Sequence, residues 1–138
     1  MKIFVSYTRM DSHINNKTLR MVELSLSGAS DIFIDALHND SEDKQCRVEE
    51  ELQSSQIMLL IKSSSIYKSK WVNRELKIAR INNIPIVSVN FVENLSFPDI
   101  KTMIRDALLT YNEANKSVNR ATQSGAPIGL PLWAAGYT

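Results

Sequence analysis

The sequence of 138 residues has few of the side chains that form cross-links or hold metals. It contains one cysteine, Cys46, and two histidines. A single cysteine cannot form a disulfide within the chain, and one cysteine with two histidines is a poor ligand set for zinc. We therefore expect a soluble domain without a metal site, suited to a reducing compartment, and we expect its location to be cytoplasmic.

An excess of charge of one sign and a long hydrophobic stretch are also absent. Sixteen Lys and Arg against fifteen Asp and Glu leave a net charge of +1, whereas a nucleic-acid-binding protein is expected to be clearly basic. The longest apolar run, residues 57–61, is far too short to cross a bilayer. Residues 1–6 lack the apolar segment of a signal peptide and resemble a first strand. We expect neither nucleic acid nor a membrane among the partners.

Glycine is missing where phosphate-binding loops would need it. The chain has four glycines, and none precedes Gly28. A Walker loop or a dinucleotide-binding turn needs its glycines directly after the first strand, where this chain has Ser6-Tyr7-Thr8-Arg9, so both are excluded. A phospho-accepting receiver domain would need an aspartate at the end of the third strand. Lys62 and Ser63 follow that apolar run instead, which excludes this class too.

The apolar residues that are present alternate between strand-like runs and helical spacing. Short apolar runs predict strands at residues 3–6, 32–34, 57–61 and 84–91. Spacings of three and four predict helices at about residues 14–28, 48–54, 70–81 and 96–112. The polar, charge-rich segment 37–47 is predicted to be a surface loop.

The order strand–helix, repeated four times, predicts an α/β fold. A central parallel β-sheet of four to five strands would lie between two layers of helices, in a flavodoxin-like three-layer fold. A distinct fifth strand before the last helix is missing or very short. In such sheets ligands bind outside the carboxyl ends of the strands, which here are Ser6-Tyr7, Asp35, Lys62-Ser63 and Asn90.

Trp71 and Glu75 form the strongest candidate pair for chemistry. Positions i and i+4 lie on one helix face, beside the inner face that Val72, Leu76 and Ala79 predict. An indole can stack on a flat heteroaromatic ring, and a carboxylate can stabilise an oxocarbenium-like ribose as that ring leaves. The alternative is that Trp71 only covers the edge of the core and Glu75 is a solvated helix residue.

Several segments, in this order, resemble the sequence boxes of Toll/interleukin-1 receptor (TIR) domains. They cover roughly residues 1–112 and are residues 4–7 with Asp11, residues 32–35, residues 54–63, the Y-x-S-x-W-x-x-x-E-L pattern of residues 67–76, and residues 84–87. Many bacterial and plant TIR domains cleave NAD, and the glutamate of that pattern is their catalytic residue. The resemblance thus implies an NAD+ nucleosidase or ADP-ribosyl cyclase in which Glu75 is catalytic and Trp71 stacks beside it.

The same resemblance implies how the substrate is bound. Ser6 and Tyr7 would line the pocket at the end of the first strand, and Asp35 would lie across from them. Apart from the resemblance, the guanidinium of Arg9 is a candidate partner for a phosphate of NAD, and a surface role is the alternative. NAD would be the substrate, so no cofactor and no metal is expected. Attack by water would give ADP-ribose, and attack by a group of the same molecule would give a cyclic ADP-ribose isomer.

With its short chain and its missing or very short fifth strand, the sequence resembles the short stand-alone TIR proteins of bacterial antiviral defence, such as those of Thoeris systems. This resemblance implies self-association through TIR–TIR contacts and a separate effector protein that responds to the product. The loop at residues 36–45 has no glycine or proline, unlike the usual assembly loop of the family, so the mode of assembly stays open. Two alternatives are a non-catalytic TIR interaction or adaptor module and a nucleoside deoxyribosyltransferase-like enzyme.

The end of the sequence differs in composition from the rest. Three of the four glycines and two of the four prolines fall in the last fourteen residues, together with Trp133 and Tyr137. We predict a TIR-like domain at residues 1–112 and a Gly/Pro/apolar tail at residues 113–138. The tail is too apolar for a solvated end and is expected to dock on the domain or on a partner.

Overall fold

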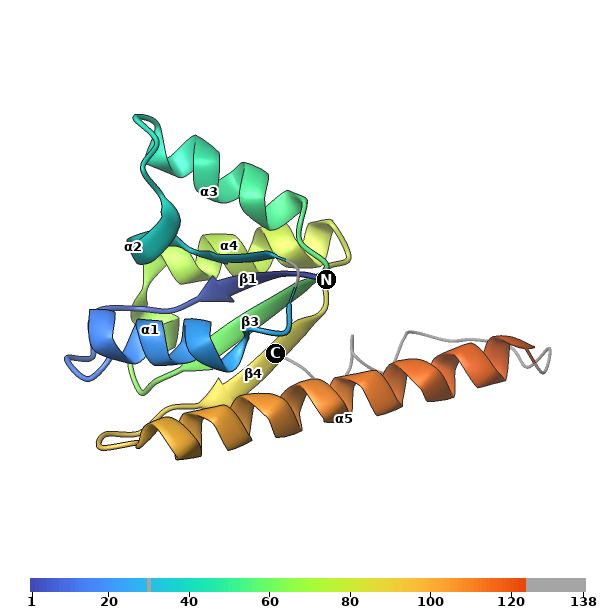
Figure 1. Cartoon of the computed structure of the whole chain (residues 1–138). Helices are drawn as coiled ribbons and strands as arrows, with labels where there is room; N and C mark the ends of the chain where they lie inside the picture. The colour runs from blue at the N-terminus through green and yellow to red at the C-terminus, as the bar shows by residue number, and fades with distance from the viewer. Residues whose placement is uncertain (30, 124–138) are drawn as a thin grey trace.

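The computed structural model describes residues 1–29 and 31–123, which form a central sheet flanked by helices (Figure 1). The strands are β1 (Lys2–Ser6), β2 (Asp31–Ile34), β3 (Ile57–Lys62) and β4 (Ile86–Asn90). All neighbouring strands are parallel, in the order β2-β1-β3-β4. The predicted flavodoxin-like α/β fold is confirmed, and the described residues contain no fifth strand.

Helices connect the strands. They are α1 (Asn16–Ser25), α2 (Asp35–His38), α3 (Lys44–Gln53), the 3-10 turn η1 (Ile66–Lys68), α4 (Lys70–Ile81) and α5 (Phe97–Gln123). Short polar side chains cap several of them: for example, Asn15 accepts a hydrogen bond from the Thr18 backbone N–H (3.0 Å), and Ser69 accepts one from that of Val72 (3.3 Å). The α4 helix has the predicted bounds. Within the described part of the chain, no helix is both long and apolar enough to cross a membrane.

The segment at residues 37–47 is not the continuous loop that we predicted. The short α2 helix extends to His38, and α3 begins at Lys44 rather than near Val48. The physical reason is a cap, because the Asp43 carboxylate accepts a hydrogen bond from the Cys46 backbone N–H at 3.0 Å. Capping adds a polar first turn to α3 that apolar periodicity does not reveal.

The sheet separates the core into two layers because side chains alternate between its faces along each strand. On one face α1 and α5 pack against Ile3, Val5 and alternate residues of β3 and β4. On the other face α3, η1 and α4 pack against Phe4, Phe33 and the intervening residues of β3. The predicted inner positions of α4, which are Val72, Leu76 and Ala79, are all buried there.

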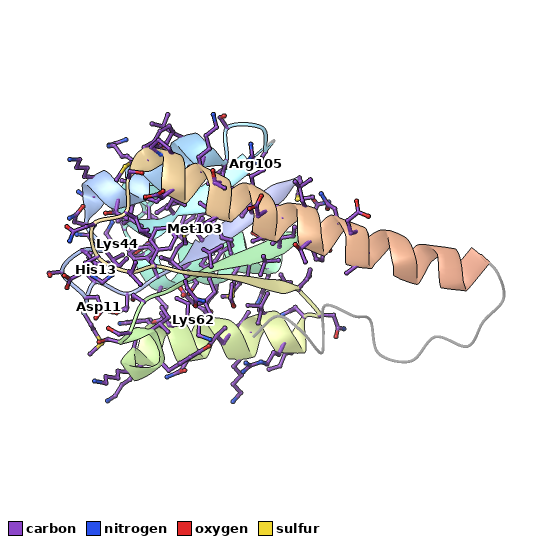
Figure 2. The ribbon with its side chains drawn as sticks, turned by 90° about the horizontal axis from the view of Figure 1, so that it is seen from below. Asp11, His13, Lys44, Lys62, Met103 and Arg105 are labelled. Carbon is purple, nitrogen blue, oxygen red and sulfur yellow. The ribbon has the colours of Figure 1, made fainter. Side chains whose placement is uncertain are left out.

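The α5 helix is longer than predicted. It contacts α1 and β4 through its first half, and Ile100, Ile104 and Tyr111 belong to the core. It then continues past residue 112 to Gln123, beyond the rest of the fold (Figures 1 and 2). Residues 113–123 contain no glycine or proline, so nothing in the backbone ends the helix there. Residues 124–138 lie outside the described residues, so the domain boundary and the docking of the tail stay predictions.

Candidate active site

The alternation of β1 brings Ser6 to the face of the sheet that α4 covers. Phe4 and Ser6 point to that face, whereas Ile3 and Val5 point to the α1 and α5 layer. The Ser6 hydroxyl, which is 1% exposed, donates a hydrogen bond of 2.8 Å to Glu75 Oε1. The fold therefore joins two predicted site residues that lie 69 positions apart in the sequence.

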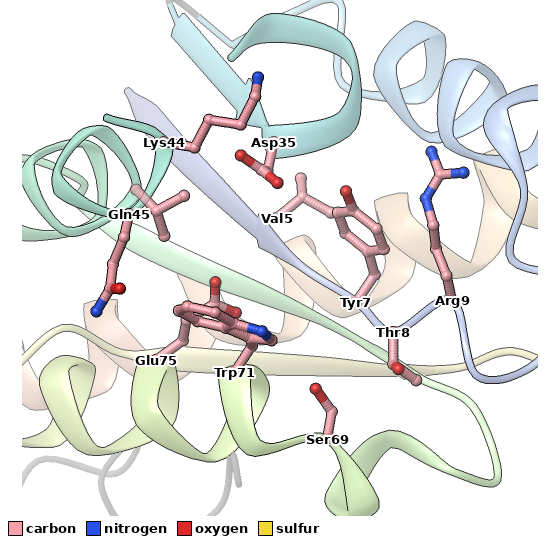
Figure 3. Close-up of a pocket in the computed structure, with 11 residues that line it drawn as sticks. Val5, Tyr7, Thr8, Arg9, Asp35, Lys44, Gln45, Ser69, Trp71 and Glu75 are labelled. Carbon is pink, nitrogen blue, oxygen red and sulfur yellow. The ribbon is translucent and has the colours of Figure 1, made fainter. Parts of the chain in front are cut away.

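A cavity of about 260 Å³ lies above this pair at the carboxyl edge of the sheet (Figure 3). Five of the six predicted site residues line it: Tyr7, Arg9, Asp35, Trp71 and Glu75. Ser6 is the exception, since it lies behind Glu75 and reaches the cavity only through the carboxylate of that residue. The contact of Ser6 that the structure shows is its hydrogen bond to Glu75, and a direct contact of Ser6 with a ligand stays a prediction.

Glu75 has an unusual protonation equilibrium for a glutamate. Burial raises the pKa of Glu75 from about 4.5 to about 7, against the lowering effect of the hydrogen bond from Ser6. The negative charge of Asp35 raises this pKa further, although by less than burial does. A carboxyl group that titrates near neutral pH inside a cavity is a common property of catalytic sites.

Trp71 does not cover the edge of the core. Its side chain is 60% exposed and lines the cavity one helical turn before Glu75 (Figure 3). Val72 on the same turn is fully buried, so the helix already has its core contact without the indole. The exposed ring is available to stack on a ligand.

Tyr7 and Asp35 form the wall of the cavity opposite α4 (Figure 3). The Tyr7 hydroxyl accepts a hydrogen bond of 2.9 Å from the Ala36 backbone N–H, which ties the end of β1 to the start of α2. Burial raises the pKa of Tyr7, so this hydroxyl stays neutral at physiological pH. Arg9 lies at the rim, where its guanidinium hydrogen-bonds to Asn16 Oδ1.

Sequence reasoning missed six residues that line the cavity, which are Val5, Thr8, Lys44, Gln45, Val48 and Ser69. Lys44 and Gln45 belong to the capped first turn of α3, which we had predicted to be loop. Ser69 could have been found, because it is the serine of the Y-x-S-x-W pattern and caps the helix that carries Trp71 and Glu75.

Two other sequence features are accounted for by local contacts. Asp11 accepts hydrogen bonds from the Ser64 hydroxyl (3.1 Å) and the Ser65 backbone N–H (2.9 Å), which fastens the loop after β1 to the one after β3. The polar groups of Ser63, Ser64 and Ser65 next to this carboxylate lower the pKa of Asp11 to about 2. The Cys46 thiol donates to Glu50, and this contact raises the pKa of the thiol, which disfavours a reactive thiolate.

The model of the TIR-like domain of the Thoeris protein ThsB matches residues 4–95. The chain belongs to this family. The matched region includes all six predicted site residues, and it ends one residue before the cap of α5. No curated protein sequence matches the chain.

Seven chains of solved structures match the fold of this TIR-like domain. One is a 2-deoxyribosyltransferase from the psychrotolerant bacterium Bacillus psychrosaccharolyticus, with 16% sequence identity and a TM-score of 0.48. The match covers 75% of this chain and 82% of that chain. A similarity at this level says nothing about the activity of the TIR-like domain.

Proposed function

We propose that this TIR-like domain is an NAD-cleaving enzyme that breaks the bond between nicotinamide and ribose. The observation that carries the proposal is the pairing of a half-buried carboxyl group, Glu75, with an exposed indole, Trp71, one turn apart on α4 in a cavity at the carboxyl edge of the sheet. NAD is the substrate in this proposal and no cofactor takes part.

Each residue has a separate task in the proposed reaction. Trp71 stacks on a flat ring of the dinucleotide, and the ionised Glu75 stabilises the ribosyl cation that forms as nicotinamide departs with the bonding electron pair. Ser6 holds the Glu75 carboxylate in place. Arg9, at the rim, is suited to a phosphate of the substrate.

The size of the cavity indicates which part of NAD enters it. Its volume of about 260 Å³ is below the range of about 300–1,000 Å³ that is usual for ligand pockets. We therefore expect the nicotinamide and its ribose to enter, while the rest of the dinucleotide crosses the rim near Trp71 and Arg9. The product is ADP-ribose or a cyclic isomer, depending on which group attacks the ribosyl cation.

The proposal is tested by incubating the purified protein with NAD and following nicotinamide release by chromatography. We expect Glu75→Gln to lower the rate about 10²–10³-fold, because the stabilising charge is lost while the shape is kept. Glu93→Gln is the matched control, since Glu93 is exposed and does not line the cavity. Equal rates for wild type and Glu75→Gln would contradict the assignment of Glu75. No release by wild type at high protein concentration with a crowding agent would contradict the activity.

The same variants separate the two alternative functions. A non-catalytic adaptor would keep its activity in cells when Glu75 is replaced, and would lose it when surface loops are changed. A deoxyribosyltransferase-like enzyme would exchange bases on nucleosides and leave NAD intact. In the proposed role, the product reaches a separate effector protein, and self-association of TIR-like domains accompanies activity.

A further inference from the structure

A second carboxylate, that of Asp35, faces the cavity from the wall opposite Glu75 (Figure 3). Asp35 is the first residue of α2, directly after β2 ends. The two carboxylates come from opposite walls of the cavity, and the negative charge of Asp35 contributes to the raised pKa of Glu75. A group bound between them would have a negative charge on each side.

The side chain of Asp35 is held in place by a buried amide. Asn39 is 8% exposed, and its Nδ2 donates hydrogen bonds to Asp35 Oδ1 (2.6 Å) and to the Lys44 backbone carbonyl (3.0 Å). The Asn39 Oδ1 accepts from the Ser41 backbone N–H at 3.2 Å. Both ends of the amide are therefore used, and its orientation fixes that of the carboxylate.

The other oxygen of Asp35 has no structural task in the described part of the chain. No described residue donates a hydrogen bond to Oδ2, and none forms an ion pair with Asp35. Lys44, a cation that lines the cavity, donates instead to the Asn39 backbone carbonyl at 2.7 Å. The carboxylate does not cap α2 either, because the N-cap position belongs to Ile34 and has no side-chain hydrogen bond. One oxygen is thus fixed while the other is free to accept a proton.

We propose that Asp35 is the general base of the reaction, taking the proton from the hydroxyl that attacks the ribosyl cation. This inference rests on the proposed function. The bond between C1′ and the nicotinamide nitrogen breaks, and its electron pair leaves with neutral nicotinamide. An oxygen of water, or of a hydroxyl of the same molecule, forms the new bond to C1′. Its proton passes to Asp35 Oδ2 and then to solvent. In retaining glycosidases one carboxylate likewise acts at the developing sugar cation, while the second acts as a base towards the attacking water.

The experiment compares attackers that do and do not carry a proton. A pyridine base such as 3-acetylpyridine attacks C1′ through a ring nitrogen that has no proton to lose, so base exchange needs Glu75 but not a general base. We expect Asp35→Asn to lower formation of ADP-ribose, or of a cyclic isomer closed through a hydroxyl oxygen, about 10²–10⁴-fold. Base exchange should fall less than tenfold. Glu75→Gln should lower both reactions together.

Controls make the result specific to Asp35. Asp40→Asn is the matched variant, because Asp40 lies in the same segment with a side chain that is 96% exposed, and it should leave both reactions unchanged. Asn39→Ala removes the amide that orients Asp35 and should lower hydrolysis more than exchange. An equal loss of both reactions in Asp35→Asn, or no loss in either, would overturn the inference while leaving NAD cleavage intact. Wild-type protein that releases no nicotinamide at all would instead refute the proposed function.

Discussion

The surroundings of Glu75 disfavour the ionised form of its carboxyl group. Burial and the charge of Asp35 favour the protonated form, whereas the hydrogen bond from the Ser6 hydroxyl favours the carboxylate, and the resulting pKa is about 7. A ribosyl cation is stabilised by the carboxylate and not by the neutral acid. The fraction of protein that is ready to act therefore depends on pH over the physiological range.

At the scale of this residue we predict a rising pH profile. The kcat/KM for NAD cleavage should increase from pH 5.5 to pH 8.5 with a midpoint near the Glu75 pKa of about 7. Ser6→Ala removes a hydrogen bond that lowers this pKa, so the midpoint should move to higher pH. Steady-state rates across this range measure both midpoints. A Ser6→Ala profile that is lower at every pH with an unchanged midpoint would show that Ser6 acts in another way.

The same pKa predicts how stability depends on pH. Because the pKa of Glu75 is raised from about 4.5 to about 7 on folding, the stability linked to its protonation is complete below pH 4.5 and is lost as pH rises through 7. Glu75→Gln should therefore raise the free energy of unfolding by about 1–3 kcal/mol at pH 8 and by much less at pH 5. Urea unfolding at the two pH values measures the difference. An equal effect at both would mean that Glu75 is not buried as described.

At the scale of elements, the accuracy with which a helix could be predicted depends on whether apolar periodicity or only a capping side chain marks its ends. The bounds of α4 follow from its amphipathic pattern, and the Ser69 cap marks the same start in the structure. The start of α3 was missed because only Asp43, a side-chain cap in a polar segment, marks it. The contact of Ser6 with Glu75 follows from strand alternation once the sheet is known. The hydrogen bond from Asn39 to Asp35 could not be predicted, because the segment around Asn39 has no apolar periodicity from which its structure could be inferred.

The first turn of α3 provides a prediction at this scale. Asp43→Ala removes the cap, so it should lower the free energy of unfolding by about 1 kcal/mol and loosen the turn that brings Lys44 and Gln45 to the cavity. We expect KM for NAD to rise while kcat changes little. Urea unfolding and steady-state kinetics test the two parts, with Asp40→Ala as the exposed control in the same segment. Unchanged stability would mean that the cap does not hold α3.

At the scale of the whole molecule, the sheet separates the layer that carries the site from the layer that does not. Trp71 and Glu75 lie on α4, whose buried residues pack with those of α3, whereas α1 and α5 cover the opposite face. The parallel sheet could be predicted because the alternation of strands and helices permits few topologies. The length of α5 could not, since its apolar periodicity ends at Tyr111 while the helix continues.

A pair of matched core variants tests this division. Val72 on α4 and Val22 on α1 are both fully buried, and replacing either by alanine should cost about 2 kcal/mol of stability. Under conditions where both variants are folded, Val72→Ala should slow nicotinamide release because it loosens the turn that carries Trp71. Val22→Ala should not. Equal loss of activity in the two would show that the site depends on the whole core.

The direction of α5 has a practical consequence. The helix starts near the carboxyl edge of the sheet, where Ile100 lies close to Phe91, and passes Met1 at Asn112 on the opposite edge. It then extends about 16 Å further to Gln123. A reporter or surface anchor joined to the backbone directly after Gln123 would leave the domain at the end of this projecting helix, on the side away from the cavity. Immobilised molecules could then be assayed with their cavities open to solution.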